Sequence, residues 1–171
     1  MVRVGLCGHM DLTSEAERVV YAALLEHLAQ LAPRPHELVG VSCLARGADT
    51  LGAKAVLELG GSLEVVLPSW DYRQAKVKPD HAPQFDALLS QATTVHTMDF
   101  DHAGRTAYEA ANSRLLELSD MLVAVWDGKP SGGKGGTADA VADARTRGLP
   151  ITVIWPDGAA RKSDAPARIQ P

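Results

Sequence analysis

Short apolar runs alternate with amphipathic helical patterns from one end of the chain to the other. The runs are apolar at nearly every position, which is typical of parallel strands in a sheet that helices cover on both faces. The pattern therefore predicts an α/β fold with a doubly wound, mainly parallel sheet of about six strands and helices on both faces. The predicted strands span residues 2–7, 38–41, 63–67, 93–97, 121–126 and 151–155.

Helix signals separate the first predicted strands. Ser14 is expected to cap the first helix, because Glu17 three residues later completes a capping box. Asp49 is expected to cap the second helix, which ends at Gly60. Both helices then lead back to the next strand, as a parallel sheet requires.

The segment from residue 68 to residue 92 has a different character. Pro79 and Pro83 interrupt it, so we expect a loop or lid that leads into a short helix at about 84–91. Further helices are predicted at about 105–118 and 137–147.

The length of 171 residues suits one domain. We expect that domain over residues 1–156 and a flexible tail, rich in Ala, Pro and charge, over residues 157–171. No apolar run approaches the roughly 20 residues that span a bilayer, and no charged leader precedes a signal core. The protein is therefore expected to be cytoplasmic and to have no membrane partner.

Few residue types in this chain suit metal or redox chemistry. Cys7 and Cys43 are too far apart for a CxxC motif and are expected to be reduced thiols in the core. The six histidines show no paired ligand spacing, so no metal site is predicted. His9 stands apart because it follows the first strand, where an imidazole can act as an acid or base near neutral pH.

Polar, glycine-containing segments follow three of the predicted strands. In a parallel sheet these segments meet at one edge, where backbone N–H groups and helix dipoles favour ligands. The third segment holds five glycines within residues 128–137, which favours close approach of the backbone to a phosphate or ribose. It lacks the GxxxxGK[ST] pattern of a Walker loop. The predicted ligand-binding residues in these segments are Gly8, His9 and Met10; Ser42, Leu44, Arg46 and Gly47; and Asp127, Gly128, Gly133, Lys134, Gly135, Gly136 and Thr137.

Charged residues in these segments allow two interpretations each. Arg46 either grips phosphate or carboxylate oxygens or pairs with an acid of a neighbouring loop. Asp139, in the first turn of the last helix, would repel an anion unless Lys134 offsets it. Alternatively, Asp127 and Asp139 accept hydrogen bonds from ribose hydroxyls.

The helix before the fifth strand contributes two more candidates. Tyr108 and Asn112 lie four residues apart and share a helix face, so both are predicted ligand contacts. Arg114 is expected to point elsewhere and to form a surface ion pair.

Two parts of the chain resemble a known superfamily. Residues 42–49, SCLARGAD, resemble the Ser-Gly-Leu-Ala-Arg-Gly-Ile-Asp segment of the DNA-processing protein A (Smf) family, with Cys43 in place of its glycine. Asn112, Arg114, the Ser119-Asp120 turn and Gly135-Gly136-Thr137 resemble the second half of the same superfamily, which also contains the LOG-type phosphoribohydrolases.

The resemblance is closest to stand-alone bacterial members of the SLOG type. It implies a Rossmann-like nucleotide-binding fold, a nucleotide phosphate held at the Gly-Thr turn, and a homodimer. LOG enzymes carry a catalytic glutamate at the position where this chain has Ala140. A glycosidic-bond carboxylate would then have to come from one of the remaining candidates, which are Asp127, Asp139 and Glu109.

The leading hypothesis is a sensor or carrier that binds a nucleotide-type ligand, AMP-like or ADP-ribose-like, with no required cofactor. The alternative is an enzyme that hydrolyses an N-glycosidic or phosphoribosyl bond in a nucleoside monophosphate, and a third is an adaptor with an empty cleft. The Smf resemblance also suggests single-stranded DNA binding. A net charge of −4 and the lack of a basic, aromatic-studded groove oppose nucleic acid as a partner.

Overall fold

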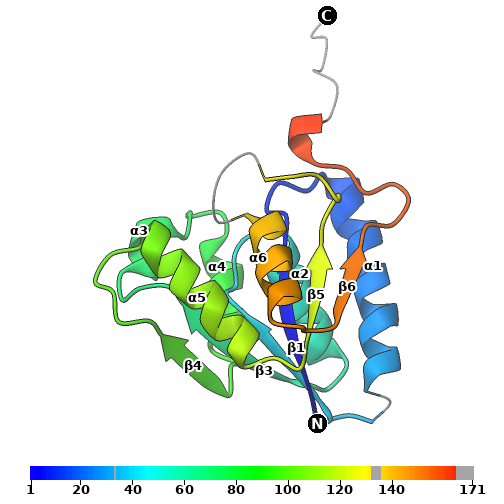
Figure 1. The fold of residues 1–171 in the computed structure, drawn as a ribbon, viewed down its shortest axis with the longest axis horizontal. Coiled ribbons are helices and arrows are strands. Elements are labelled where there is room, and N and C mark those ends of the chain that lie inside the picture. The colour runs from blue at the N-terminus through cyan, green and yellow to red at the C-terminus, as the bar shows by residue number, and fades with distance from the viewer. Residues whose placement is uncertain (33, 132–135, 165–171) are drawn as a thin grey trace, which may run out of the picture.

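The computed structural model describes residues 1–32, 34–131 and 136–164 of the chain. Six parallel strands form one sheet in the order β4-β3-β2-β1-β5-β6, with helices between them (Figure 1). The predicted α/β class and mainly parallel, doubly wound sheet are therefore confirmed. The strands are β1 (Val2–Gly8), β2 (Leu38–Ser42), β3 (Ser62–Leu67), β4 (Thr94–Thr97), β5 (Met121–Val125) and β6 (Ile151–Ile154).

The sheet reverses its direction of growth beside β1. The chain first adds β2, β3 and β4 on one side of β1 and then returns to add β5 and β6 on the other side. The loops that follow β1 and β5 therefore diverge at the carboxyl edge of the sheet, and open α/β sheets bind ligands at such a switch point. In Figure 1 the arrows of β5 and β6 point to this edge, at the top of the view.

Helices cover both faces of the sheet. The helices are α1 (Ser14–Leu31), α2 (Ala48–Glu58), α3 (Tyr72–Lys76), α4 (Ala82–Leu89), α5 (Arg105–Glu117) and α6 (Thr137–Thr146). In Figure 1, α5 and α6 lie on the side of the sheet towards the viewer. The buried side chains of α1, α2 and α4 join two clusters on one face, and those of α5 and α6 join a third.

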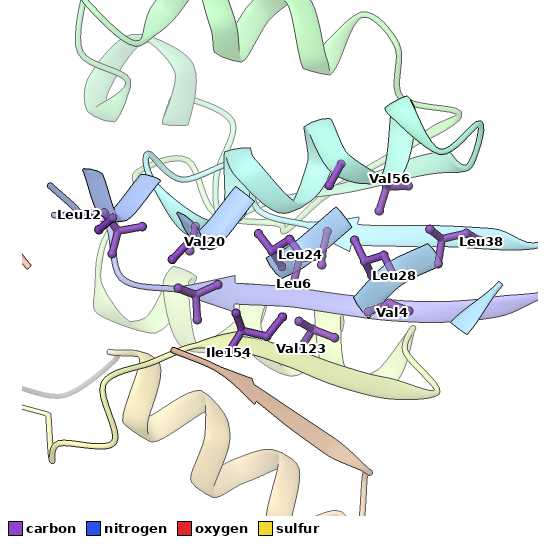
Figure 2. Close-up of a cluster of buried hydrophobic side chains, with 14 residues drawn as sticks. Val4, Leu6, Leu12, Val20, Leu24, Leu28, Leu38, Val56, Val123 and Ile154 are labelled. Carbon is purple, nitrogen blue, oxygen red and sulfur yellow. The ribbon is translucent and has the colours of Figure 1, made fainter. Parts of the chain in front are cut away.

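Successive residues of β1 face the two helix layers on opposite sides of the sheet. Figure 2 shows Leu6 and Val4 of β1 beside Leu24 and Leu28 of α1. A Cβ atom at the intervening Gly5 would instead lie 2.8 Å from Leu115 of α5. The strand is apolar throughout because each face meets a helix layer.

The two helix caps differ from the sequence prediction. Thr13, not Ser14, caps α1, because its hydroxyl accepts a hydrogen bond from the Ala16 backbone N–H at 3.1 Å. Gly47, not Asp49, is the N-cap of α2. Asp49 lies in the first turn of α2 and is buried, and its carboxylate belongs to the site described below.

The segment between β3 and β4 is more ordered than the predicted loop. It contains α3 and then α4, which begins two residues earlier than expected. The ring of Tyr72 packs against those of Phe85 and Tyr108, at 6.0 and 6.4 Å between centroids. These aromatic contacts hold α3 against α4 and α5, and sequence periodicity does not report such contacts.

The segment after β6 turns back over the start of the chain. Leu12 and Arg161 form an antiparallel bridge, and the Lys162 backbone N–H donates to the Asp11 carbonyl oxygen. A 3-10 turn, Lys162–Asp164, ends the described part. The first half of the predicted flexible tail, residues 157–164, is thus packed as a C-terminal strap, while residues 165–171 lie outside the described residues. No helix in the described ranges has the length and apolar character to cross a bilayer.

Candidate functional site

A cavity of about 590 Å³ opens at the carboxyl edge of the sheet, where β1 and β5 diverge. We call it the main cavity. Its volume lies within the roughly 300–1,000 Å³ range of small-molecule pockets. Walls come from the loops after β1, β2 and β5, from α3, α5 and the start of α6, and from the C-terminal strap.

Seven of the predicted ligand residues line the main cavity. They come from three separate parts of the chain that only the fold brings together. They are Gly8, His9, Met10, Tyr108, Asn112, Gly136 and Thr137. The structure thus places the loop after β1, one face of α5 and the start of α6 around a common space.

Gly8 ends β1 in a crowded position. A Cβ atom there would lie 2.6 Å from both the Ala48 Cβ and the Val125 carbonyl oxygen. Glycine is required because α2 and β5 leave no room for a Cβ atom at this position. The close approach leaves backbone, rather than a side chain, as the floor of the cavity at this point.

Three predicted residues of the loop after β2 shape the loop instead of lining the cavity. The Ser42 hydroxyl accepts a hydrogen bond from the Leu44 N–H at 3.0 Å and is fully buried. Leu44 is also fully buried and adopts a left-handed φ of 55°. Gly47 has φ of 82°, and a Cβ atom there would lie 2.6 Å from the His9 carbonyl oxygen. These residues fold the backbone of the loop, and none of the three lines the main cavity.

Arg46 lies at the same loop but faces a second, smaller cavity. Its guanidinium pairs with the exposed carboxylate of Asp80, in the segment between α3 and α4. Of the two interpretations of Arg46, the ion pair with a loop acid is the one that the described structure contains.

The buried carboxylate of Asp49 ties the first two loops together. It accepts backbone hydrogen bonds from Ala45, Cys43 and Gly8. Burial raises the pKa of Asp49 to about 7 even though these N–H groups favour the charged form. The aspartate that closes the SCLARGAD segment thus holds the loops after β1 and β2 in one conformation beside the cavity.

His9 and Asp127 join the loops after β1 and β5. Nε2 of His9 lies 3.1 Å from the Asp127 backbone nitrogen and 3.0 Å from the Asp127 Oδ1. An unprotonated Nε2 accepts from the backbone N–H, whereas a protonated Nε2 donates to the carboxylate. The edge of the His9 ring also contacts Trp155, with centroids 5.6 Å apart. His9 therefore positions the β5 loop as well as lining the cavity.

Asp127 itself does not line the main cavity. Its side chain is buried, and its Oδ2 accepts no hydrogen bond from any described residue. Burial opposes ionisation, but the Lys129 N–H, His9 and Arg161 together hold the pKa of Asp127 below its ordinary value. The neighbouring Gly128, with φ of 78°, does not line the cavity either, and Gly133, Lys134 and Gly135 lie outside the described residues.

Arg161 is one of the cavity residues that the sequence prediction missed. It comes from the C-terminal strap and lines the main cavity. Its Nε donates to Asp11 Oδ1 at 2.9 Å, and its Nη1 lies 3.7 Å from Asp127 Oδ2. No local pattern marks this arginine, because only the bridge between residues 12 and 161 brings it to the site.

The candidate catalytic carboxylates do not line the main cavity. Glu109 is exposed and pairs with Arg105 at 3.0 Å. Asp139 lies in the first turn of α6 but is not among the lining residues, whereas Ala140 lines the cavity and is 8% exposed. The position that carries a glutamate in LOG enzymes thus faces the cavity with a methyl group.

The two cysteines also line the main cavity, as Cys7 of β1 and Cys43 after β2. Both thiols are free. Burial and the nearby Asp49 raise the pKa of both thiols, so they stay protonated near neutral pH. They supply apolar wall rather than nucleophiles. Within the described ranges, no three His, Cys, Asp or Glu side chains group as a metal site.

Fold and cavity together define a Rossmann-like α/β protein with a pocket at the switch point of its sheet. Solved structures of DNA-processing protein A share this fold. The one from Streptococcus pneumoniae gives a TM-score of 0.65 at 17% identity, over 92% of this chain and 53% of that chain. The one from Helicobacter pylori, reported for its single-stranded DNA binding mode, gives 0.64 at 19% identity, over 91% and 66%.

A third similar structure is that of the protein TM1055, with a TM-score of 0.56 and 19% identity, over 88% of this chain and 72% of that one. This chain spans 53% of the length of the Streptococcus pneumoniae protein and 66% of the length of the Helicobacter pylori protein. No protein-family model and no curated protein matches the sequence. The likeness shows that this chain shares the Rossmann-like fold of these proteins.

Proposed function

We propose that this protein binds a nucleotide or nucleotide-derived small molecule in the main cavity, as a sensor or carrier. The observation that carries the proposal is a cavity at the switch point bounded by bare backbone at Gly8 and by the amino end of α6. The first backbone N–H groups of a helix are unpaired within it and favour an anion. Phosphate is the anionic group that nucleotides present.

The rest of the lining suits a nucleoside. Tyr72, Tyr108 and Trp126 supply aromatic surface for a base, and Asn112 supplies an amide that can both donate and accept hydrogen bonds. Arg161 adds a guanidinium at the strap. Apolar walls with few polar groups are typical of sites that hold small organic ligands.

An N-glycosidic hydrolase is the second candidate, and Ala140 weighs against it. Such a reaction needs a carboxylate at the anomeric carbon. The described carboxylates that line the main cavity are Asp11, which Arg161 engages, and Asp49, which backbone N–H groups engage. Neither is free to act on a sugar without breaking contacts that hold the loops.

A panel of nucleoside monophosphates tests both candidates in one experiment. Binding without chemistry predicts a concentration-dependent rise in melting temperature and no free base by liquid chromatography. Release of free base would favour the hydrolase. A melting temperature unchanged by every nucleotide at millimolar concentration would refute the proposal.

The fold shared with DNA-processing protein A adds an oligonucleotide arm to the same panel. Fluorescence anisotropy of a labelled dT20 strand, at two salt concentrations, measures single-strand binding. The chain's net charge of −4 favours weak or absent binding, and submicromolar affinity at physiological salt would favour a nucleic-acid role.

A further inference from the structure

A second cavity of about 280 Å³ adjoins the main cavity. The two share four lining residues, which are Met10, Asp11, Tyr72 and Lys76. We call the second cavity the annex. Its remaining lining residues are Arg46, Val77, Lys78, His81 and Lys162.

The annex is strongly cationic. Arg46, Lys76, Lys78 and Lys162 line it, whereas Asp11 is the one carboxylate among its described lining residues, in a chain whose net charge is −4. Asp11 is already engaged, because Arg161 and Ser163 bind its two carboxylate oxygens. The local field of the annex is therefore opposite in sign to that of the whole chain.

Three of these four cations form no ion pair with a described residue, although Lys78 also interacts electrostatically with the Asp80 carboxylate that pairs with Arg46. Lys76, Lys78 and Lys162 form no ion pair with any residue in the described ranges, and Arg46 pairs with Asp80 at the exposed rim. They also come from three distant segments: the loop after β2, the end of α3 with the residues after it, and the C-terminal strap. Like charges that the fold gathers around one hollow repel each other until an anion compensates them.

The annex and the start of α6 serve different parts of the site. Gly136, Thr137, Ala138 and Ala140 line only the main cavity, on the β5 side of the switch point. The annex adjoins the main cavity at Met10 and Tyr72, on the side of the β2 loop and α3. The combined site therefore has two regions that favour anions, one at the amino end of α6 and one in the annex.

We propose that the annex binds a second phosphate of the ligand, so that the site takes a nucleotide with two separated phosphates rather than a nucleoside monophosphate. This inference rests on the proposed function. The expected ligand is a nucleoside with one phosphate at the amino end of α6 and a second phosphate among Lys76, Lys78 and Lys162. Such a phosphate belongs either to a free nucleoside bisphosphate or to the next phosphodiester of a short oligonucleotide.

Calorimetric titration with adenosine 5′-monophosphate, adenosine 3′,5′-bisphosphate and the dinucleotide pApA tests the inference on the full chain. We expect the bisphosphate or the dinucleotide to bind at least about 10-fold more tightly than the monophosphate, as charge-assisted contacts predict. Tighter binding of pApA identifies a strand as the source of the phosphate, and tighter binding of the bisphosphate identifies a free metabolite.

A double variant locates the effect. Lys78→Gln with Lys162→Gln removes two charges that line the annex but not the main cavity. The preference for the second phosphate should then fall about 10-fold, while monophosphate affinity changes less than about 3-fold. The matched control, Lys54→Gln with Arg34→Gln, removes two charges that line neither cavity and should leave the preference intact.

The outcomes separate this inference from the proposed function. If the monophosphate binds and a second phosphate adds no affinity, the proposal for the annex is wrong and the proposed function stands. If the second phosphate still raises the affinity in Lys78→Gln/Lys162→Gln, the proposal for the annex is also wrong. Failure of all three probes to bind refutes the proposed function itself.

Discussion

Arg161 donates from Nε to the Oδ1 atom of Asp11 at 2.9 Å, although 150 residues separate the two in sequence. The pair joins the C-terminal strap to the loop after β1, and the same guanidinium approaches buried Asp127. One wall of the main cavity therefore depends on a segment that lies beyond the last strand of the sheet.

Replacement of this arginine should loosen the strap and weaken the site together. We expect Arg161→Gln to lower the free energy of unfolding by about 1 kcal/mol, because the ion pair is only partly buried. It should also reduce the thermal shift produced by a bound nucleotide. Denaturant unfolding with and without ligand measures both effects. Arg34→Gln, which breaks an exposed pair with Glu37, is the control and should change neither by as much.

A negative charge introduced at the amino end of α6 tests whether a phosphate binds there, without disturbing the helix. Gly136 is the N-cap of α6 with extended backbone, so Gly136→Asp introduces a favourable cap residue and a negative charge at the cavity. Among the described residues, an added Cβ atom would meet the Ser131 side chain, with its hydroxyl oxygen at 2.8 Å. We expect unchanged or higher intrinsic stability but at least about a 10-fold loss of affinity for a phosphate-bearing ligand.

Gly104→Asp is the matched control for that variant. Gly104 is the N-cap of α5, its added Cβ meets nothing within 4 Å, and it does not line the main cavity. It should keep full ligand affinity in the same thermal-shift titration. Equal loss of affinity in both variants would contradict a phosphate position at α6.

Gly47 should be more sensitive to substitution than Gly148, although both have a left-handed backbone conformation. Gly47→Ala meets both a left-handed φ of 82° and the His9 carbonyl oxygen at 2.6 Å. Gly148→Ala has a similar φ of 72° but open space around its Cβ. We expect a loss of about 1 kcal/mol for Gly148→Ala and about 3 kcal/mol or more for Gly47→Ala, from chemical denaturation. Similar losses would contradict a close approach of the two loops.

Asp49 should give the protein a measurable pH dependence. Its pKa of about 7 in the folded state lies above its ordinary value of 3.8. Between these values the folded state binds more protons than the unfolded state, so the contribution of Asp49 to stability falls as pH rises from about 4 to about 7.

Asp49→Asn isolates this contribution. With a folded-state pKa of about 7, Asp49 is protonated at pH 5, and an asparagine amide offers one acceptor oxygen much as that neutral carboxyl does, so we expect a loss of no more than about 1 kcal/mol at pH 5. The loss should shrink towards pH 8, where the wild-type carboxylate is charged and buried. Urea titrations of both proteins across this range provide the measurement, and a loss that grows with pH would contradict the assignment.

Much of the fold follows from local patterns in the sequence. All six predicted strands match the observed ones to within about one residue at most ends, because continuous apolar runs between helical patterns have few other solutions in a globular chain. Caps are less certain from sequence. Thr13 and Ser14 are both good capping residues, and only the backbone conformation selects Thr13.

The site was predictable where the topology alone brings loops together. Gly8, Tyr108 and Gly136 all follow or precede strands at one edge of a parallel sheet, and the structure places them around the main cavity. Ser42, Leu44 and Gly47 lie at the same edge, yet they are used to fold the loop. Chain position therefore indicated which loops meet, but not which side chains face the space between them.

The alternation of apolar runs and helical repeats by itself determined the order and class of the elements. A strand that is buried on both faces is apolar at nearly every position, and this is a local pattern that the sequence shows directly. Tertiary structure alone decided that Arg161 lines the cavity, that Arg46 pairs with Asp80, and that four cations surround the annex. The physical reason is that a loop side chain takes its direction from backbone angles and distant contacts, and neither leaves a periodic signal in the sequence.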